Sequence, residues 1–148
     1  MDYAQVFEIS ASGMAVQKTR LEVAAHNLAN ANTVEGANGK PYQPLRVVSK
    51  ATSAGYSTPA TFGAAMDAAS LGGASASLAA DTSAEPRLVH EPGHPMADRN
   101  GMVRYPGVNH LDQMVNITEA LRAYEANVAA LQAAKTMAAR ALDIGGNQ

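Results

Sequence analysis

The sequence contains no cysteine and no tryptophan, and only two of its 148 residues are phenylalanine. Without cysteine the chain can form neither a disulfide nor a thiolate metal site, so its stability does not depend on an oxidising compartment. Few bulky aromatic residues and many alanines leave only a thin core for a single copy to bury. The composition therefore predicts one domain that relies on neighbouring molecules for much of its packing.

The chain is close to neutral, with a formal net charge of −2, and it contains no block of basic residues. This argues against nucleic acid and anionic membranes as partners. No apolar run approaches eighteen residues, and no basic segment followed by an apolar one opens the chain. We therefore expect neither a membrane span nor a cleavable signal peptide, and a protein acting outside the cytoplasm would have to leave by another route.

The longest regular pattern spans residues 109–143, where apolar residues keep a helical register. They fall on the a and d rows of a heptad seam: Met114, Leu121, Val128 and Leu142, then Ile117, Tyr124, Leu131 and Ala138. Lys135, which interrupts the first row, is expected to reach the rim of the seam or to mark where the seam meets a different partner. Asn109 is placed to cap the helix, and Gly145-Gly146 to end it. A helix of roughly 35 residues spans roughly 50 Å, so it needs a second long helix from this chain or from another copy.

The first thirty residues predict that second helix, starting near Asp2. Two apolar rows run along it: Phe7, Met14, Leu21 and Leu28, then Ile9, Val16 and Val23. Two apolar sides imply two sets of neighbours, whereas a simple hairpin needs only one. The alternative is a helix buried in an ordinary globular core. The expected fold is mainly α, with long terminal helices (1–33 and 109–148) paired as a coiled-coil-like layer and a small irregular and β middle segment (34–108).

The middle segment is expected to leave and rejoin the helical layer at sites rich in asparagine and proline. The residues singled out for this exit and re-entry are Asn27, Asn30, Asn32, Pro92, Pro95 and Pro106. Turns are predicted at residues 35–39, and strands at 42–49 and 87–90. The Ala/Ser/Gly-rich tract 51–84 is interpreted as a mobile excursion or as a loop that orders against neighbours, with a weak helix signal at 64–70.

One stretch spells a catalytic motif. His90-Glu91-Pro92-Gly93-His94 matches HExxH, in which two histidines one helical turn apart bind zinc and the glutamate activates water. Pro92 and Gly93 lie between the histidines and disfavour the helix that this chemistry requires. We therefore interpret the stretch as a turn and expect no metal, no cofactor, no small-molecule substrate and no catalytic residue.

Three blocks of sequence resemble the axial proteins of the bacterial flagellum, the family of rod and hook subunits. They are LEVAAHNLANANT at Leu21–Thr33, EPGHPMADRNGMVRYPGV at Glu91–Val108, and MVNITEALRAYEANVAALQAAKTM at Met114–Met137. NGKPYQ at Asn38–Gln43 is also similar. The second block resembles the segment typical of proximal rod proteins. Gly107 departs from the family pattern, which usually has asparagine there, and the Ala/Ser/Gly tract is longer than expected.

The resemblance implies a non-enzymatic subunit of the basal-body proximal rod, which assembles helically in the periplasm, transmits torque and encloses the export channel. It also implies export by the flagellar type III apparatus, and contacts with other copies, other proximal and distal rod proteins and the protein at the junction with the MS ring. The apolar rows of both helices would form the assembly interface, and folding would be coupled to assembly. The alternative is a soluble coiled-coil adaptor or export chaperone.

Overall fold

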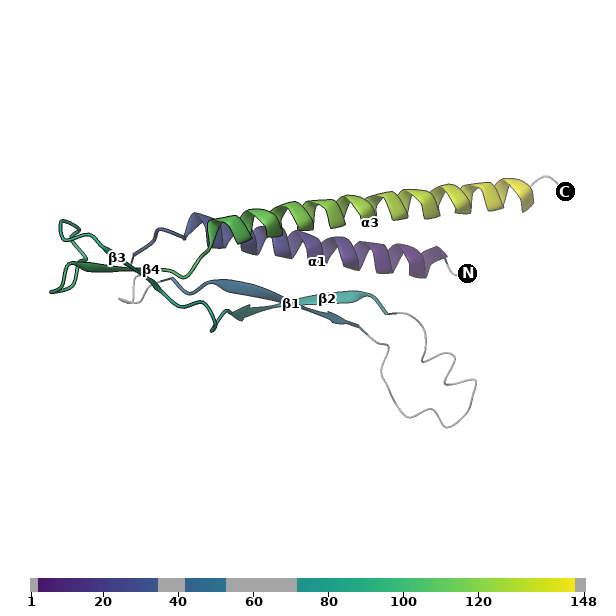
Figure 1. Cartoon of the computed structure of the whole chain (residues 1–148). Coiled ribbons are helices and arrows are strands. Elements are labelled where there is room, and N and C mark those ends of the chain that lie inside the picture. The colour runs from purple at the N-terminus through teal and green to yellow at the C-terminus, as the bar shows by residue number, and fades with distance from the viewer. Residues whose placement is uncertain (1–2, 35–41, 53–71, 146–148) are drawn as a thin grey trace, which may run out of the picture. The chain divides into compact units, whose positions relative to one another are not determined.

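The computed structural model describes residues 3–34, 42–52 and 72–145 (Figure 1). In chain order its elements are α1 (Tyr3–Ala29), β1 (Leu45–Ala51), β2 (Ala74–Ala80), β3 (Arg87–His90), β4 (Met102–Tyr105) and α3 (His110–Gly145). The mainly α fold with long terminal helices is confirmed. The expected helix start at Asp2, the turns at 35–39, the weak helix at 64–70 and the stop at Gly146 lie outside the described residues.

Side chains at the helix ends explain where α1 stops and α3 starts. Asn30 bonds to the carbonyl oxygen of His26 twice, through its main-chain N–H at 3.2 Å and its Nδ2 at 2.9 Å. At the start of α3, Asn109 Oδ1 accepts a hydrogen bond from the N–H of Leu111 at 3.0 Å. Both asparagines satisfy main-chain groups that a helix end leaves unpaired. The predicted cap at Asn109 is thus confirmed.

The described residues form two compact units, and each contains a part of both long helices. In the first unit, a side chain at Gly13 of α1 would meet the amide of Asn127 of α3, so the two helices approach closely here. In the second unit, Asn27 Nδ2 of α1 donates to Gln113 Oε1 of α3 at 3.3 Å. Later residues of α1 therefore meet earlier residues of α3, and the helices pair in antiparallel directions.

Small side chains make the close approach of the two helices possible. On α3 the inward row is Gln113, Ala120, Asn127 and Ala134, in which both alanines are at most 3 % exposed. These residues recur every seven positions, so they share one face of the helix. The inward row lies one residue before the predicted row that starts at Met114. Small and polar residues therefore contribute to the contact between the helices, whereas Met114, Leu121 and Leu142 of α3 remain largely exposed.

β1 and β2 form a two-stranded sheet, and they run antiparallel because main-chain bonds join residue 52 to 73 and residue 44 to 81. Two main-chain bonds flank it, from Thr52 N–H to Gly73 O at 2.7 Å and from Asp81 N–H to Pro44 O at 2.8 Å. At the start of β2, Ser12 Oγ of α1 accepts a hydrogen bond from the N–H of Ala74 at 2.9 Å. The interpretation of 51–84 as a loop was wrong for β2, because main-chain bonds and this helix contact hold a strand that side-chain propensity does not predict.

The second sheet pairs β3 with β4 in antiparallel register, with Arg87 opposite Tyr105 and His90 opposite Met102. β3 occupies the predicted strand 87–90, whereas β4 lies in a run rich in proline and glycine for which no strand was predicted. Val103 at the middle of β4 is 0 % exposed. The Arg87 guanidinium lies 5.4 Å from the centre of the Tyr105 ring, a cation–π contact on the same side as Val103.

Candidate assembly surfaces

The predicted rows of α3 remain largely uncovered in the single chain. Met114 is 55 % exposed, Leu121 45 %, Tyr124 40 % and Leu142 75 %, and Ile117, Val128 and Leu131 are part-buried. Lys135, on the same row, is also exposed. Large apolar side chains repeated along one helix are costly to leave in water. Their arrangement makes this helix face a candidate surface for contact with other protein helices.

The predicted rows of α1 are covered to a greater extent. Val16 and Val23 are buried at 4 % and 8 % exposure, whereas Phe7, Ile9, Met14, Leu21 and Leu28 are part-buried. In the first unit, α1 contacts α3 at Gly13 and the start of β2 at Ser12. The chain thus supplies α1 with neighbours of two kinds, a helix and a strand.

Asn27 joins three segments within the second unit. Its side chain is 2 % exposed, and Nδ2 donates to the carbonyl oxygen of Leu45 at 2.8 Å as well as to Gln113. Oδ1 accepts from the Leu45 N–H at 2.9 Å and from the Tyr42 hydroxyl at 2.8 Å. Burial raises the pKa of Tyr42. His26 Nδ1 lies 2.8 Å from the same hydroxyl oxygen, and its ring contacts the Tyr42 ring.

The other residues predicted at the exit and re-entry of the chain differ in how far they are buried. Asn30 caps α1, whereas Asn32 is exposed. Pro92 and Pro95 are exposed in the loop between β3 and β4, and Pro106 is buried shortly before α3. Asn27 and Pro106 are therefore the members of this set that the folded chain encloses.

The HExxH stretch has the turn geometry that its proline and glycine predict. His90 ends β3, and His94 lies in the following loop, where its Nδ1 accepts a hydrogen bond from the N–H of Met96 at 3.1 Å. Glu91 accepts a bond from the Tyr105 hydroxyl at 3.0 Å. The two imidazoles are therefore not presented together on one helix face, which a zinc protease site of this type requires. Within residues 3–34, 42–52 and 72–145 no cluster of candidate metal ligands occurs.

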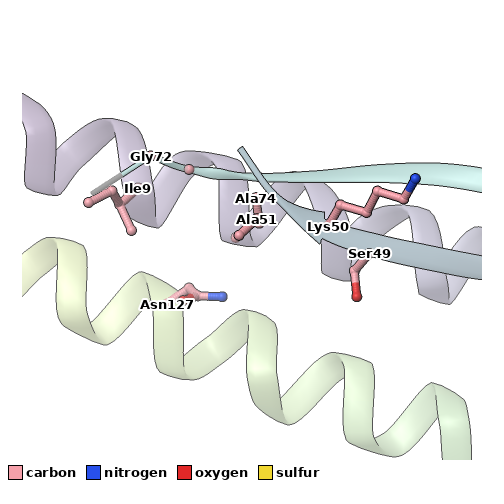
Figure 2. Close-up of a pocket in the computed structure, with 9 residues that line it drawn as sticks. Ile9, Ser49, Lys50, Ala51, Gly72, Ala74 and Asn127 are labelled. Atoms are coloured by element: carbon pink, nitrogen blue, oxygen red, sulfur yellow. The ribbon is translucent and has the colours of Figure 1, made fainter. Parts of the chain in front are cut away.

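The first unit contains a cavity of about 340 Å³ between α1, α3 and the sheet. Figure 2 shows Asn127 on α3 facing the strand ends at Ala51 and Ala74, with Ile9 on α1 nearby. Lys50 is the ionisable residue in a lining otherwise made of small, apolar and amide side chains. A pair of groups for acid–base catalysis is absent from this lining. The cavity is a packing gap between close helices and strands.

Gly107, the departure from the family pattern, has a structural reason. A side chain at this position would overlap the main-chain carbonyl of Glu85. Since the obstacle is main chain, a neighbouring side chain cannot relieve the overlap by rotating away. The 84–85 segment therefore occupies the space that asparagine would need.

We expect Gly107→Asn to lower the free energy of unfolding by about 2 kcal/mol, because the main chain at Glu85 must shift. Urea unfolding monitored by circular dichroism would measure the change. Gly93→Asn is the matched control, since open space surrounds Gly93. Equal unfolding midpoints for the two variants would contradict the explanation.

The inward row of α3 is the contact set that the sequence analysis did not identify. Its residues are small or polar, so the heptad pattern of large apolar side chains does not include them. The available signal was the seven-residue spacing of Gln113, Ala120, Asn127 and Ala134 beside a larger apolar row. Small residues at such spacing indicate close helix contact, while the larger row indicates a further neighbour.

No helix among the described residues is both long and apolar enough to cross a membrane. Two paired helices with an apolar row left uncovered are typical of structural subunits that pack against neighbouring molecules. Two family models agree with this class: "Flagella basal body rod protein" matches residues 7–37, and "Flagellar basal body rod FlgEFG protein C-terminal" matches residues 99–144. The matches cover most of α1 and nearly all of α3.

Similar proteins cover almost the whole chain. Flagellar basal-body rod protein FlgC of Salmonella typhimurium is 38 % identical over 146 residues, which is 98 % of this chain and 99 % of the relative. FlgC of Escherichia coli O6:H1 is 37 % identical over 98 % of this chain and 99 % of its own length. FlgC of Bacillus subtilis is 32 % identical over 93 % of this chain and 94 % of its own length. The chain belongs to the FlgC family of flagellar basal-body rod proteins. It is a structural subunit of the rod and not an enzyme.

Proposed function

We propose that this subunit assembles helically into the proximal rod through the apolar rows of its long helices. The assembled rod would span the periplasm, transmit torque and enclose the export channel. The uncovered row of α3, with Met114, Leu121 and Leu142 at 45–75 % exposure, is the observation that carries the proposal. A contact that does not close into a ring repeats from copy to copy and generates a helical tube.

The proposed partners follow from this mode of assembly. They are other copies of the chain, other proximal and distal rod proteins, and the protein at the junction with the MS ring. Membership of a rod family supports assembly with rod proteins in general. The flagellar type III apparatus is the proposed export route. Folding of the long helices would be completed on assembly, because burial of the uncovered row needs neighbouring molecules.

The absence of cysteine from the chain makes a direct test possible. Leu142→Cys places a single thiol at a side chain that is 75 % exposed in the folded chain. We expect a maleimide to label this thiol at least tenfold more slowly in isolated rods than in the free subunit. The measurement is a labelling time course followed by mass spectrometry.

Ser83→Cys is the control, because Ser83 is exposed in a turn after β2 and belongs to neither helix. Its thiol should label at similar rates in both states. Rods in which the Leu142→Cys and Ser83→Cys thiols remain equally reactive would contradict burial of the α3 row.

A further inference from the structure

The loop between β3 and β4 is held by its own hydrogen bonds. Glu91 N–H donates to Gly101 O at 2.8 Å, and Asp98 N–H donates to Met102 O at 2.9 Å. Asp98 Oδ1 accepts from the N–H groups of Asn100 and Met102 at 2.8 and 2.9 Å, which lowers the pKa of this carboxyl group. Gly101 has φ +72°, a conformation that other residues rarely adopt. A loop ordered in advance loses little entropy when it binds a partner.

This loop presents one apolar and one cationic side chain to solvent. Met96 is 43 % exposed, and Arg99 is exposed with no ion pair among the described residues. The neighbouring carboxylate of Asp98 is already engaged by main-chain donors. The tip, defined here as Met96 and Arg99, therefore suits a partner surface that combines apolar area with negative charge.

The chain carries a surface of that kind at the start of α3. Leu111 is 68 % and Val115 47 % exposed, and Asp112 and Glu119 are exposed beside them. Relative to Val115 the other three lie four residues before, three before and four after, so all four share one helix face. Arg122, one turn after Glu119, ends this acidic and apolar patch.

We propose that the Met96–Arg99 tip of one copy docks on the Leu111–Glu119 patch of a second copy in the rod. Met96 would pack on Leu111 and Val115, while Arg99 would lie between the carboxylates of Asp112 and Glu119. The two surfaces are different, so the contact is heterologous and can repeat without closing. The inference rests on the proposed helical assembly and names one contact within it.

Charge reversal tests the electrostatic part of this contact in cells whose own rod subunit is deleted. Arg99→Glu should reduce the number of complete rods at least roughly tenfold, because it places like charges opposite one another. Adding Glu119→Arg should restore the number to within about twofold of the unsubstituted chain. Failure of the second substitution to restore rods, with both variants folded by circular dichroism, would overturn the pairing.

Cross-linking between two singly substituted chains tests the geometry. Co-expression of Met96→Cys and Val115→Cys chains, followed by a short bis-maleimide on isolated rods, should give a dimer of this chain. Met96→Cys with Ala130→Cys, at an exposed alanine of α3 outside the patch, should not. Three results would overturn the inference. They are equal dimer yields in both pairs, no dimer in intact rods, and a cross-link from the Met96→Cys thiol only to a different rod protein. Failure of the unsubstituted chain to form rods would instead overturn the proposed assembly itself.

Discussion

Leu121→Asp should abolish rod formation while the subunit remains soluble and is still exported. Leu121 is 45 % exposed in the single chain, so water can hydrate a carboxylate at this position in the folded subunit. In the proposed assembly the same carboxylate would be buried against a neighbouring helix without a partner, at a cost of several kcal/mol per contact. Repeated along a tube, such a cost removes assembly altogether. Motility and electron microscopy of basal bodies would measure the loss.

Ala126→Asp is the matched control for Leu121→Asp. It introduces the same carboxylate five residues further along α3, at an exposed position on another side of the helix. We expect it to retain rods. Normal rods in Leu121→Asp would contradict the assignment of the Met114–Leu142 row to the interface. Loss of rods in both variants would show that a carboxylate on either face of α3 prevents assembly, so the effect would not be specific to the Met114–Leu142 row.

Asn27→Ala should cause a large loss of stability in the second unit. The substitution leaves the Leu45 main chain and the Tyr42 hydroxyl without the partners that Asn27 provides. Each buried polar group without a partner costs about 1–3 kcal/mol, so a total loss of about 3 kcal/mol is expected. Urea unfolding followed by far-UV circular dichroism would measure the loss.

Asn32→Ala is the control for Asn27→Ala, since Asn32 lies in the same asparagine-rich segment but is exposed. Its unfolding midpoint should be nearly unchanged. Similar midpoints for both variants would show that the hydrogen bonds of Asn27 contribute little to the fold.

The long helices were predictable because their signals are local and repeated. Heptad spacing of large apolar residues, a capping asparagine and a terminal glycine pair all indicated α3 independently. The short strand at Arg87–His90 was predictable from its apolar pair between proline- and glycine-rich runs. The HExxH stretch was judged correctly from Pro92 and Gly93, because the steric restriction that proline imposes does not depend on distant contacts.

Features that depend on contacts between distant segments were not predictable. The sequence of β2, ASASLAA, has little intrinsic strand preference, and its position is set by β1 and by Ser12. The four hydrogen bonds of the buried Asn27 side chain were likewise not predictable, although the segment was identified as the place where the chain leaves the helix. Heptad spacing alone could not show which of two adjacent rows on α3 faces α1.

The division of α3 into two faces links the fold to the proposed assembly of the rod. Small residues such as Ala120 and Ala134 bring α3 close to α1 within the chain, which leaves the larger apolar row free for neighbours. A subunit that used its large side chains for internal packing would have little left for assembly. The alternative of an adaptor or export chaperone is not retained, because the chain belongs to a family of structural rod proteins.

The most direct test is an electron cryo-microscopy map of rods built from this subunit at side-chain detail. The account predicts that Met114, Leu121 and Leu142 are buried against helices of neighbouring subunits, while Ala120 and Ala134 remain packed within their own chain. A map in which the Met114–Leu142 row faces solvent, or in which neighbouring subunits touch only through the β-sheets, would contradict it.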